Sequence, residues 1–120
     1  MPHITVDYSE NLESSFDRRA FALALHPLVA ETVDTKLTAC KTRFRRADTM
    51  VVAGGAPTDA AVYIDIALLA GRTTELKTRL SESVVALLAG YLKPVDGVMP
   101  PVYAEVRDLA PSYRKSETES

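Results

Sequence analysis

The sequence has 120 residues, of which 47% are hydrophobic and 25% are charged, and its formal net charge is −2. This length and apolar content suit one compact domain with its own core and do not suit a disordered chain. The slightly acidic balance argues against a dedicated nucleic-acid binder, because such proteins usually carry a strong basic excess. The sequence contains no apolar run of about 18 residues and does not begin like a signal peptide. We therefore expect a cytoplasmic protein that binds neither nucleic acid nor a membrane.

The chain begins with a predicted strand and helix. Residues 3–8 alternate polar and apolar side chains, which is the pattern of a strand with one buried face. We expect the helix to be capped by Ser14 or Ser15 and to run to about Val33. Pro27 lies within this helical pattern and should kink it or begin a new segment. The predicted buried stripe of the helix comprises Phe16, Ala20, Leu23, Ala24 and Leu28.

Extended segments and a second helix follow. Extended segments are expected at 39–46, 50–52, 62–68 and 102–107. The second helix is predicted to begin after a cap at Thr73 or Thr74 and to end near Gly90. Its predicted buried stripe comprises Leu76, Leu80, Val84, Leu87, Leu88 and Tyr91.

These elements make two strand–helix–strand units of similar design, over about residues 1–55 and 56–110. Such a unit normally makes a right-handed crossover between parallel strands. The expected fold class is therefore α/β (α+β), a tandem β-α-β arrangement with a four-stranded, mainly parallel or mixed sheet and two helices on one face. The polar residues 111–120 are interpreted as a C-terminal tail. The second sheet face would be left uncovered, so we expect an oligomer.

Pro2 is the first candidate catalytic residue. A strand that begins at residue 3 holds Pro2 at a sheet edge, and methionine aminopeptidases remove Met1 when the next residue is small. Removal leaves a secondary amine, and burial beside cations lowers the pKa of an α-amino group from about 8 towards the range of a general base at neutral pH. The alternative is an ordinary proline without a function. If Met1 is retained, the Pro2 nitrogen is an amide and cannot act as a base.

Two basic features are candidates for binding a carboxylate. In a strand, Lys41, Arg43 and Arg45 share one face, and a bound carboxylate would relieve their mutual repulsion. Arg72 lies between a strand and a helix N-terminus, where anions are favoured. The alternatives are a solvated charged face and a plain surface arginine. Cys40 is the only cysteine and has no Cys or His cluster beside it in sequence, so we expect no metal site.

Several short motifs occur in an order that resembles one known family. They are Met-Pro-His at the start followed by an apolar strand and Ser9-Glu10-Asn11, then Lys41-Thr42-Arg43, Ala47-Asp48-Thr49, Ala70-Gly71-Arg72 and the strand from Glu105 to Leu109. This order and spacing resemble the 5-carboxymethyl-2-hydroxymuconate Δ-isomerase family of the tautomerase superfamily, over nearly the whole chain. The resemblance implies a tautomerase-like domain over residues 1–110, usually assembled as a homotrimer, that works without a cofactor.

The resemblance also implies roles for individual residues. Pro2 would move a proton within a dienol di- or tricarboxylate, and Lys41, Arg43 and Arg72 would bind the small anionic carboxylate substrate. Lys41 departs from the family pattern, which has an arginine there, and a lysine keeps the charge but lacks the planar fork that grips a carboxylate. Three functions therefore stay open: a hydroxymuconate isomerase of aromatic catabolism, an enzyme that isomerises, hydrates or decarboxylates another small oxo acid, and a non-catalytic binding or assembly protein.

Overall fold

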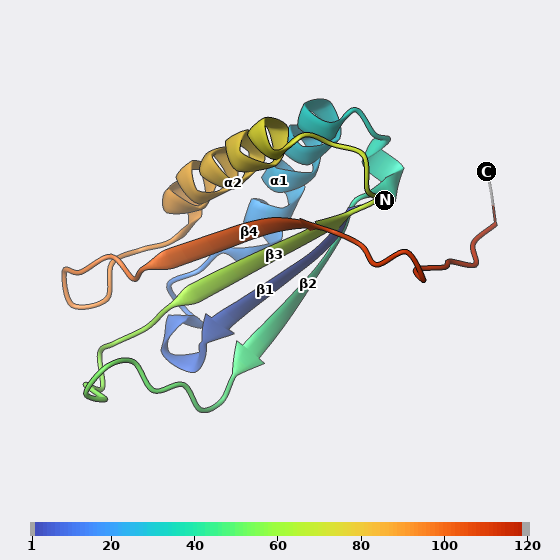
Figure 1. The fold of residues 1–120 in the computed structure, drawn as a ribbon. Coiled ribbons are helices and arrows are strands. Elements are labelled where there is room, and N and C mark those ends of the chain that lie inside the picture. Colours follow the sequence, from blue (N-terminus) through green and yellow to red (C-terminus); the bar gives the residue numbers. More distant parts are fainter. Residues whose placement is uncertain (1, 119–120) are drawn as a thin grey trace.

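A mixed sheet with both helices on one face makes up the computed structural model, which describes residues 2–118 (Figure 1). The principal elements are β1 (His3–Ser9), α1 (Arg18–Val33), β2 (Lys41–Ala47), β3 (Val62–Leu68), α2 (Thr74–Leu88) and β4 (Val102–Asp108). Short 3-10 helices are η1 (Glu10–Leu12), η2 (Leu37–Ala39) and η3 (Ala89–Tyr91). Within residues 2–118, no helix is both long and apolar enough to cross a membrane.

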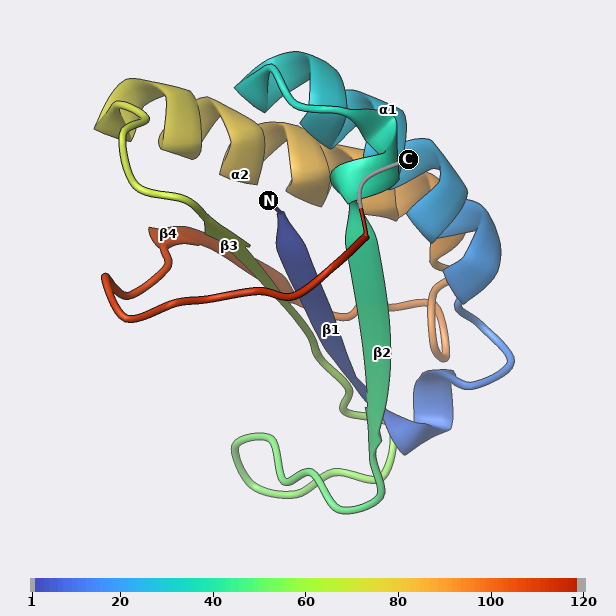
Figure 2. The same ribbon diagram turned by 90° about the vertical axis from the view of Figure 1, so that its right-hand side faces the viewer.

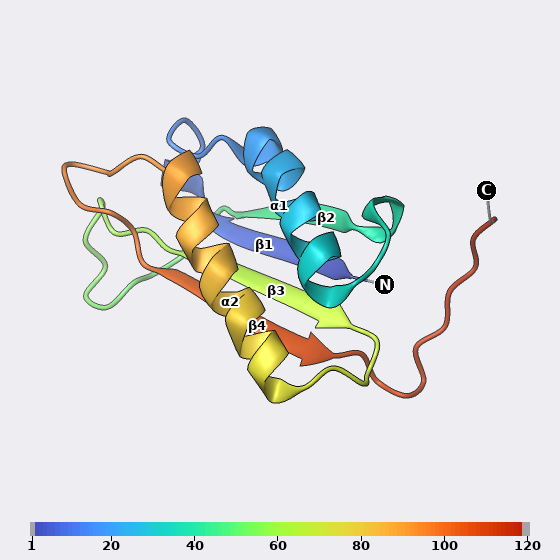
Figure 3. The ribbon, with the colours of Figure 1, turned by 90° about the horizontal axis from the view of Figure 1, so that it is seen from above.

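The strand order is β2-β1-β3-β4. Strands β1 and β2 are parallel, and so are β3 and β4, as predicted for two strand–helix–strand units. The two halves join through an antiparallel pairing of β1 with β3, which makes the sheet mixed. Seen from above, α1 and α2 lie side by side over the same face of the sheet (Figure 3). The predicted fold class is confirmed.

The extended segment predicted at 50–52 does not form a strand. Residues 48–61 form a loop between β2 and β3 instead. The loop turns where the Gly55 amide donates to the Val52 carbonyl at 2.8 Å, and both Ala53 and Gly55 have positive φ angles, of 47° and 83°. A backbone in this left-handed region cannot continue a strand.

Helix α1 differs from the sequence prediction at its start and in its buried face. Asp17 caps it by accepting a hydrogen bond from the Ala20 amide, so the predicted caps at Ser14 or Ser15 are wrong. The helix passes through Pro27 without ending there. The residues buried along α1 are Phe21, Leu25, Val29 and Val33. Leu23, predicted to be buried, is 59% exposed, because a helix that packs through an i, i+4 series turns the intervening position outward.

Helix α2 follows the prediction. Thr73 caps it by accepting a hydrogen bond from the Leu76 amide, and its buried stripe runs through Leu80, Val84 and Leu88. Both helix stripes pack against the apolar side of the sheet, which forms one continuous core. The sheet residues of this core include Ile4, Val6, Tyr8, Val62, Ile64, Ile66 and Leu68.

The opposite sheet face, here called the open face, is polar and not covered by a helix (Figure 2). Two arginines on it make two-pronged ion pairs: Arg45 contacts Asp7 at 2.7 and 3.0 Å, and Arg107 contacts Asp65 at 2.9 and 3.1 Å. Because these side chains are charged and paired, the open face is compatible with water. The open face is therefore mainly polar, although it also exposes the rings of Tyr63 and Tyr103.

Candidate active site

The candidate site lies at the end of the sheet where β1 begins. His3 of β1 is in register with Lys41 of β2 and with Ala67 of β3. The starts of β1 and β2 and the end of β3 therefore meet at one end of the sheet. Pro2, the residue before His3, is buried there. This arrangement brings two of the predicted site residues, Pro2 and Lys41, to adjacent strand ends.

The three cations of β2 lie on the open face as the strand pattern predicts, but they are not equivalent. Arg45 is neutralised by Asp7. Arg43 donates a hydrogen bond to the Thr5 hydroxyl at 3.2 Å, and Lys41 is exposed. Within residues 2–118, no carboxylate lies within ion-pair distance of Lys41 or Arg43. These two residues therefore keep their charge available for an anion, whereas Arg45 does not.

Arg72 lies at the same end of the sheet but faces the helix layer. Its Nη2 atom donates to the Val33 carbonyl at 2.9 Å and its Nη1 atom donates to the Leu69 carbonyl at 3.2 Å. Val33 ends α1, so the guanidinium of Arg72 binds the end of a helix. The structure thus places Lys41 and Arg43 on the open face, leaves Pro2 buried at the start of β1, and turns Arg72 towards α1.

His3 has a partner that sequence reasoning missed. Its Nε2 atom lies 2.7 Å from the hydroxyl of Tyr113, and the two rings meet edge-on at 5.4 Å. Burial and the nearby charge of Lys41 lower the pKa of His3, so its neutral form is favoured. Tyr113 lies in the segment interpreted as a polar tail. An aromatic residue among polar ones is the signal that could have indicated a docked side chain.

Two further residues beside the site are structural. Cys40 is buried, and burial raises the pKa of its thiol, which keeps it protonated and poorly nucleophilic. The ring of His26, for which the sequence suggested no partner, lies 2.8 Å from the Thr42 hydroxyl and joins α1 to β2. Neither group faces the open side of the sheet with Lys41.

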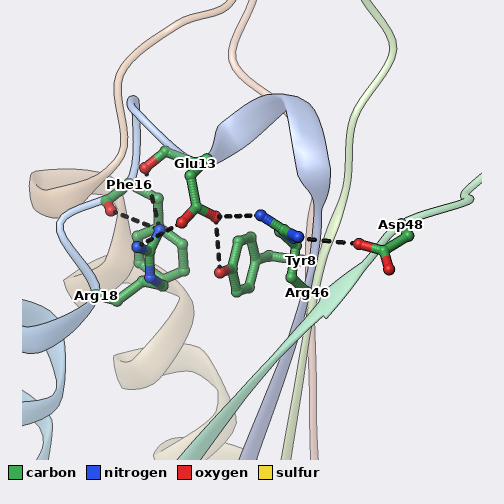
Figure 4. A network of polar contacts seen from close by, with 6 residues as sticks. All are labelled: Tyr8, Glu13, Phe16, Arg18, Arg46 and Asp48. Atoms are coloured by element: carbon green, nitrogen blue, oxygen red, sulfur yellow. Dashed lines mark hydrogen bonds and ion pairs between the residues drawn. The ribbon is translucent and has the colours of Figure 1, made fainter.

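A separate ion-pair network occupies the other end of the sheet and accounts for Arg46 (Figure 4). The Glu13 carboxylate accepts from the Tyr8 hydroxyl at 3.0 Å and from Arg18 at 3.2 Å. Arg46 lies 3.9 Å from Glu13 and 3.2 Å from Asp48. The guanidinium of Arg18 also lies over the Tyr8 ring, 5.0 Å from its centre. Because its charges are matched, this network ties the β1–α1 connection to β2 and leaves no excess charge for a ligand.

A shallow pocket of about 250 Å³ lies at this same far end, between the loop 48–61 and the ends of β1 and β2. Its lining includes Ser9, Asn11 and Asp48 and contains none of the predicted site residues. Within residues 2–118, no three His, Cys, Asp or Glu side chains are grouped to hold a metal ion. We therefore place the candidate site at the end of the sheet where β1 and β2 begin, here called the Pro2 end. The choice rests on the positive charges at this end that are unpaired within the described residues, and not on the presence of a pocket.

The Pro2 end suits an organic anion. Lys41 and Arg43 supply positive charge. Two exposed apolar residues belong to the same end of the sheet: Leu37 in η2, just before β2, is 55% exposed, and Leu69, just after β3, is 45% exposed. Cations that line an apolar surface bind carboxylates more strongly than they do in open water. Pro2 is buried at this same end of the sheet.

Comparisons with solved structures agree with this architecture. A 5-carboxymethyl-2-hydroxymuconate isomerase from Deinococcus radiodurans R1 superimposes with a TM-score of 0.83 at 21% identity, over 97% of this chain and 90% of that one. A 5-carboxymethyl-2-hydroxymuconate delta-isomerase gives a TM-score of 0.84 at 16% identity, over 98% and 89% of the two chains. A fused 4-OT symmetric trimer gives 0.73 at 19% identity, over 96% and 93%. At these identities the likeness shows a shared fold.

A comparison at the level of sequence families goes further. Residues 2–98 match the family described as 5-carboxymethyl-2-hydroxymuconate isomerase. A comparison with curated proteins gives no significant match. The family match covers most of the chain, including Pro2, Lys41, Arg43 and Arg72. The chain therefore belongs to the 5-carboxymethyl-2-hydroxymuconate isomerase family, within the tautomerase superfamily, and is an isomerase.

Proposed function

We propose that this isomerase moves a proton within a 2-hydroxymuconate-type dienol that carries two or three carboxylates, with the Pro2 nitrogen as the general base. The observation that carries the proposal is the position of Pro2, buried at the start of β1 beside a strand whose Lys41 and Arg43 have no carboxylate partner within residues 2–118. The Pro2 nitrogen becomes basic once Met1 has been removed, because the amide is then replaced by a secondary amine.

The proposed reaction needs one proton acceptor and a site of positive charge. The Pro2 nitrogen takes the proton of the 2-hydroxyl group, and the same nitrogen then delivers a proton to a distal carbon, so the dienol becomes a conjugated 2-oxo acid with no net gain or loss of protons. Lys41 and Arg43 hold substrate carboxylates and stabilise negative charge on the developing enolate. In general, positive charge beside an amine disfavours its protonated form.

The test compares chains that differ only at the N-terminus. Mature protein that begins with Pro2 should ketonise 2-hydroxymuconate, with a rate that rises with pH through the pKa of the amine. Protein that keeps Met1 should lose the activity, and Pro2→Ala with Met1 removed should retain part of it, because alanine still offers a primary amine. Intact mass establishes the terminus of each chain. Equal activity with and without Met1 would falsify the mechanism.

The lysine at position 41 favours a second candidate function, in which the same Pro2 mechanism acts on another small oxo acid. Lysine at this position offers a point charge in place of a planar fork, which weakens two-point recognition of a carboxylate. A panel of dienols with one, two and three carboxylates separates the two candidates. The highest kcat/KM on a monocarboxylate would favour the second.

We further propose that the chain assembles as a homotrimer. The support is its likeness to a tautomerase-fold protein described as a symmetric trimer. The polar open face provides ion pairs and stacked aromatic rings, Tyr63 on Tyr103 at 4.9 Å, for a neighbouring chain to cover. Light scattering at micromolar concentration should give three times the 13.1 kDa chain mass, and a single species of one chain mass would contradict the proposal.

A further inference from the structure

A tight turn after β4 brings one aromatic side chain to the Pro2 end. The Leu109 amide donates to the Leu68 carbonyl at 2.6 Å, which holds the end of β4 against the end of β3. The Tyr113 amide then donates to the Ala110 carbonyl at 2.9 Å and closes the turn. Tyr113 is half-buried, whereas residues 110–112 are exposed. The turn therefore directs the Tyr113 side chain towards the sheet.

Tyr113 contacts the side chain of His3 in two ways. Its hydroxyl lies 2.7 Å from the Nε2 atom of His3, and the two rings meet edge-on with their centres 5.4 Å apart. A hydrogen bond together with an edge-on ring contact fixes the orientation of the imidazole as well as its position. Because His3 directly follows Pro2, a residue 110 positions later in the chain orients the side chain next to the candidate base.

His3 lies on the open face, in the row next to the cations of β2. Side chains alternate along β1, and Asp7, four residues after His3, makes its ion pair with Arg45 on this face. His3 is in register with Lys41, and neighbouring strands lie about 4.8 Å apart. The imidazole is therefore the neighbour of Lys41 on the same side of the sheet.

The hydrogen bond from Tyr113 determines which nitrogen of His3 carries a proton. Burial and the nearby charge of Lys41 lower the pKa of His3, which favours the neutral ring with a single N–H group. When the Tyr113 hydroxyl donates to Nε2, that proton lies on Nδ1. Within residues 2–118, the only hydrogen bond of the imidazole is the one to Tyr113. The Nδ1–H group is therefore available to a ligand.

We propose that His3 is a further substrate-binding residue, whose Nδ1–H group donates to a carboxylate held by Lys41, and that Tyr113 is its positioning residue. The proposal rests on the proposed function in taking Lys41 as a residue that binds a substrate carboxylate. Lysine supplies a point charge without the planar fork of arginine. A directed N–H donor from the neighbouring strand would supply the second contact, so His3 and Lys41 together would recognise both oxygens of one carboxylate.

Binding of cis,cis-muconate, a stable dicarboxylate, tests the proposal without requiring turnover. The dissociation constant is measured by NMR titration for the unmodified chain, Tyr113→Phe, His3→Phe and the double variant. We expect His3→Phe to bind about five- to tenfold more weakly and Tyr113→Phe about two- to fivefold more weakly, because a directed hydrogen bond is lost or misaligned. The double variant should bind like His3→Phe alone, since Tyr113 acts through His3.

Tyr91→Phe is the matched control for the loss of a tyrosine hydroxyl. Tyr91 is half-buried in η3, where its carbonyl accepts a hydrogen bond from the Asp17 amide at the start of α1. This variant should bind muconate like the unmodified chain. In steady-state kinetics on 2-hydroxymuconate, His3→Phe and Tyr113→Phe should raise KM more than they lower kcat, because the lost contact is to a carboxylate that does not react.

Nitrogen NMR of the imidazole rings reads out the positioning role directly. The chain has two histidines, so His26→Gln assigns the signals of His3. At a pH above the pKa of the ring, His3 should carry its proton on Nδ1, and Tyr113→Phe should shift it towards the Nε2–H form. A ring protonated on Nε2 in the unmodified chain would overturn the proposal.

The binding results separate this proposal from the proposed reaction. Equal affinity of His3→Phe, Tyr91→Phe and the unmodified chain would overturn the role of His3, and so would additive losses in the double variant or a complete absence of binding. Weaker binding by His3→Phe and Tyr113→Phe in a mature chain that does not isomerise 2-hydroxymuconate would support the role of His3 and reject the proposed reaction.

Discussion

The guanidinium of Arg72 donates a hydrogen bond of 2.9 Å to the carbonyl oxygen of Val33, the last residue of α1. A helix end leaves its final carbonyls without partners within the helix, and positive charge there is favourable. The same guanidinium holds the Leu69 carbonyl at 3.2 Å, so it joins the end of α1 to the connection between β3 and α2. The arginine expected from the sequence to bind substrate therefore also holds the fold together beside the site.

Replacing Arg72 by Ala should lower the free energy of unfolding by about 1–3 kcal/mol, because a partly buried carbonyl loses a charged donor. Urea denaturation measures the change. The free energy of unfolding of Arg72→Lys should lie between those of the unmodified chain and Arg72→Ala, since lysine restores the charge but not both hydrogen bonds. Arg79→Ala, at an exposed position of α2, provides the control and should change stability by less than about 0.5 kcal/mol. A loss of kcat/KM with unchanged stability would mean that Arg72 serves substrate binding alone.

Replacing Lys41 by Gln should lower kcat/KM on a dicarboxylate dienol about 10- to 100-fold, because a charge-assisted contact to the substrate is lost. Lys41→Arg should retain or raise kcat/KM, since arginine restores a planar fork. Steady-state kinetics on mature protein measures both. Lys93→Gln removes an exposed lysine outside the site and should have no effect. If Lys41→Gln matched this control, Lys41 would belong to a solvated surface.

The free energy of unfolding should decrease as the pH is lowered through the range in which histidine side chains titrate. Burial lowers the pKa of His26 and of His3 below the usual value of 6.5. The unfolded chain therefore binds protons at a higher pH than the folded chain, so the free energy of unfolding decreases as pH falls below about 6.5. His26→Gln keeps a partner for the Thr42 hydroxyl without titrating, and its pH dependence should be shallower. Urea denaturation at pH values of about 7.5 and 5.5 makes the comparison. An unchanged slope in His3→Gln/His26→Gln would contradict it.

Leu23 and Leu25 lie on opposite sides of α1 and provide a matched pair. Leu25 is fully buried, so Leu25→Ala should lower the free energy of unfolding by about 2–5 kcal/mol through lost apolar contacts and a cavity. Leu23 is 59% exposed, and Leu23→Ala should change it by less than about 0.5 kcal/mol. Thermal or urea unfolding of the two variants measures the difference. Similar losses would mean that the helix is rotated relative to the sheet.

Local patterns in the sequence determined much of the fold. The strict alternation in residues 62–68 predicted β3, and Thr73 with its following apolar stripe predicted α2, because capping and periodicity involve neighbouring residues. The start and the rotation of α1 were less accessible. Asp17 and the nearby Ser14 and Ser15 are all residues that can cap a helix, so the sequence does not distinguish between them. A helix rich in alanine and leucine also offers more than one possible buried stripe, and packing against the sheet decides which stripe is buried.

The resemblance to a known family predicted that Pro2, Lys41, Arg43 and Arg72 belong to one site. In the structure, the parallel strands β1 and β2 begin at the same end of the sheet and bring Pro2 and Lys41 there. Tertiary structure alone decided which charges are available there. Asp7 neutralises Arg45 from the neighbouring strand, and Tyr113 reaches His3 across 110 positions of sequence. Such contacts depend on strand register and on the path by which the chain returns. A pattern within a few residues carries no record of either.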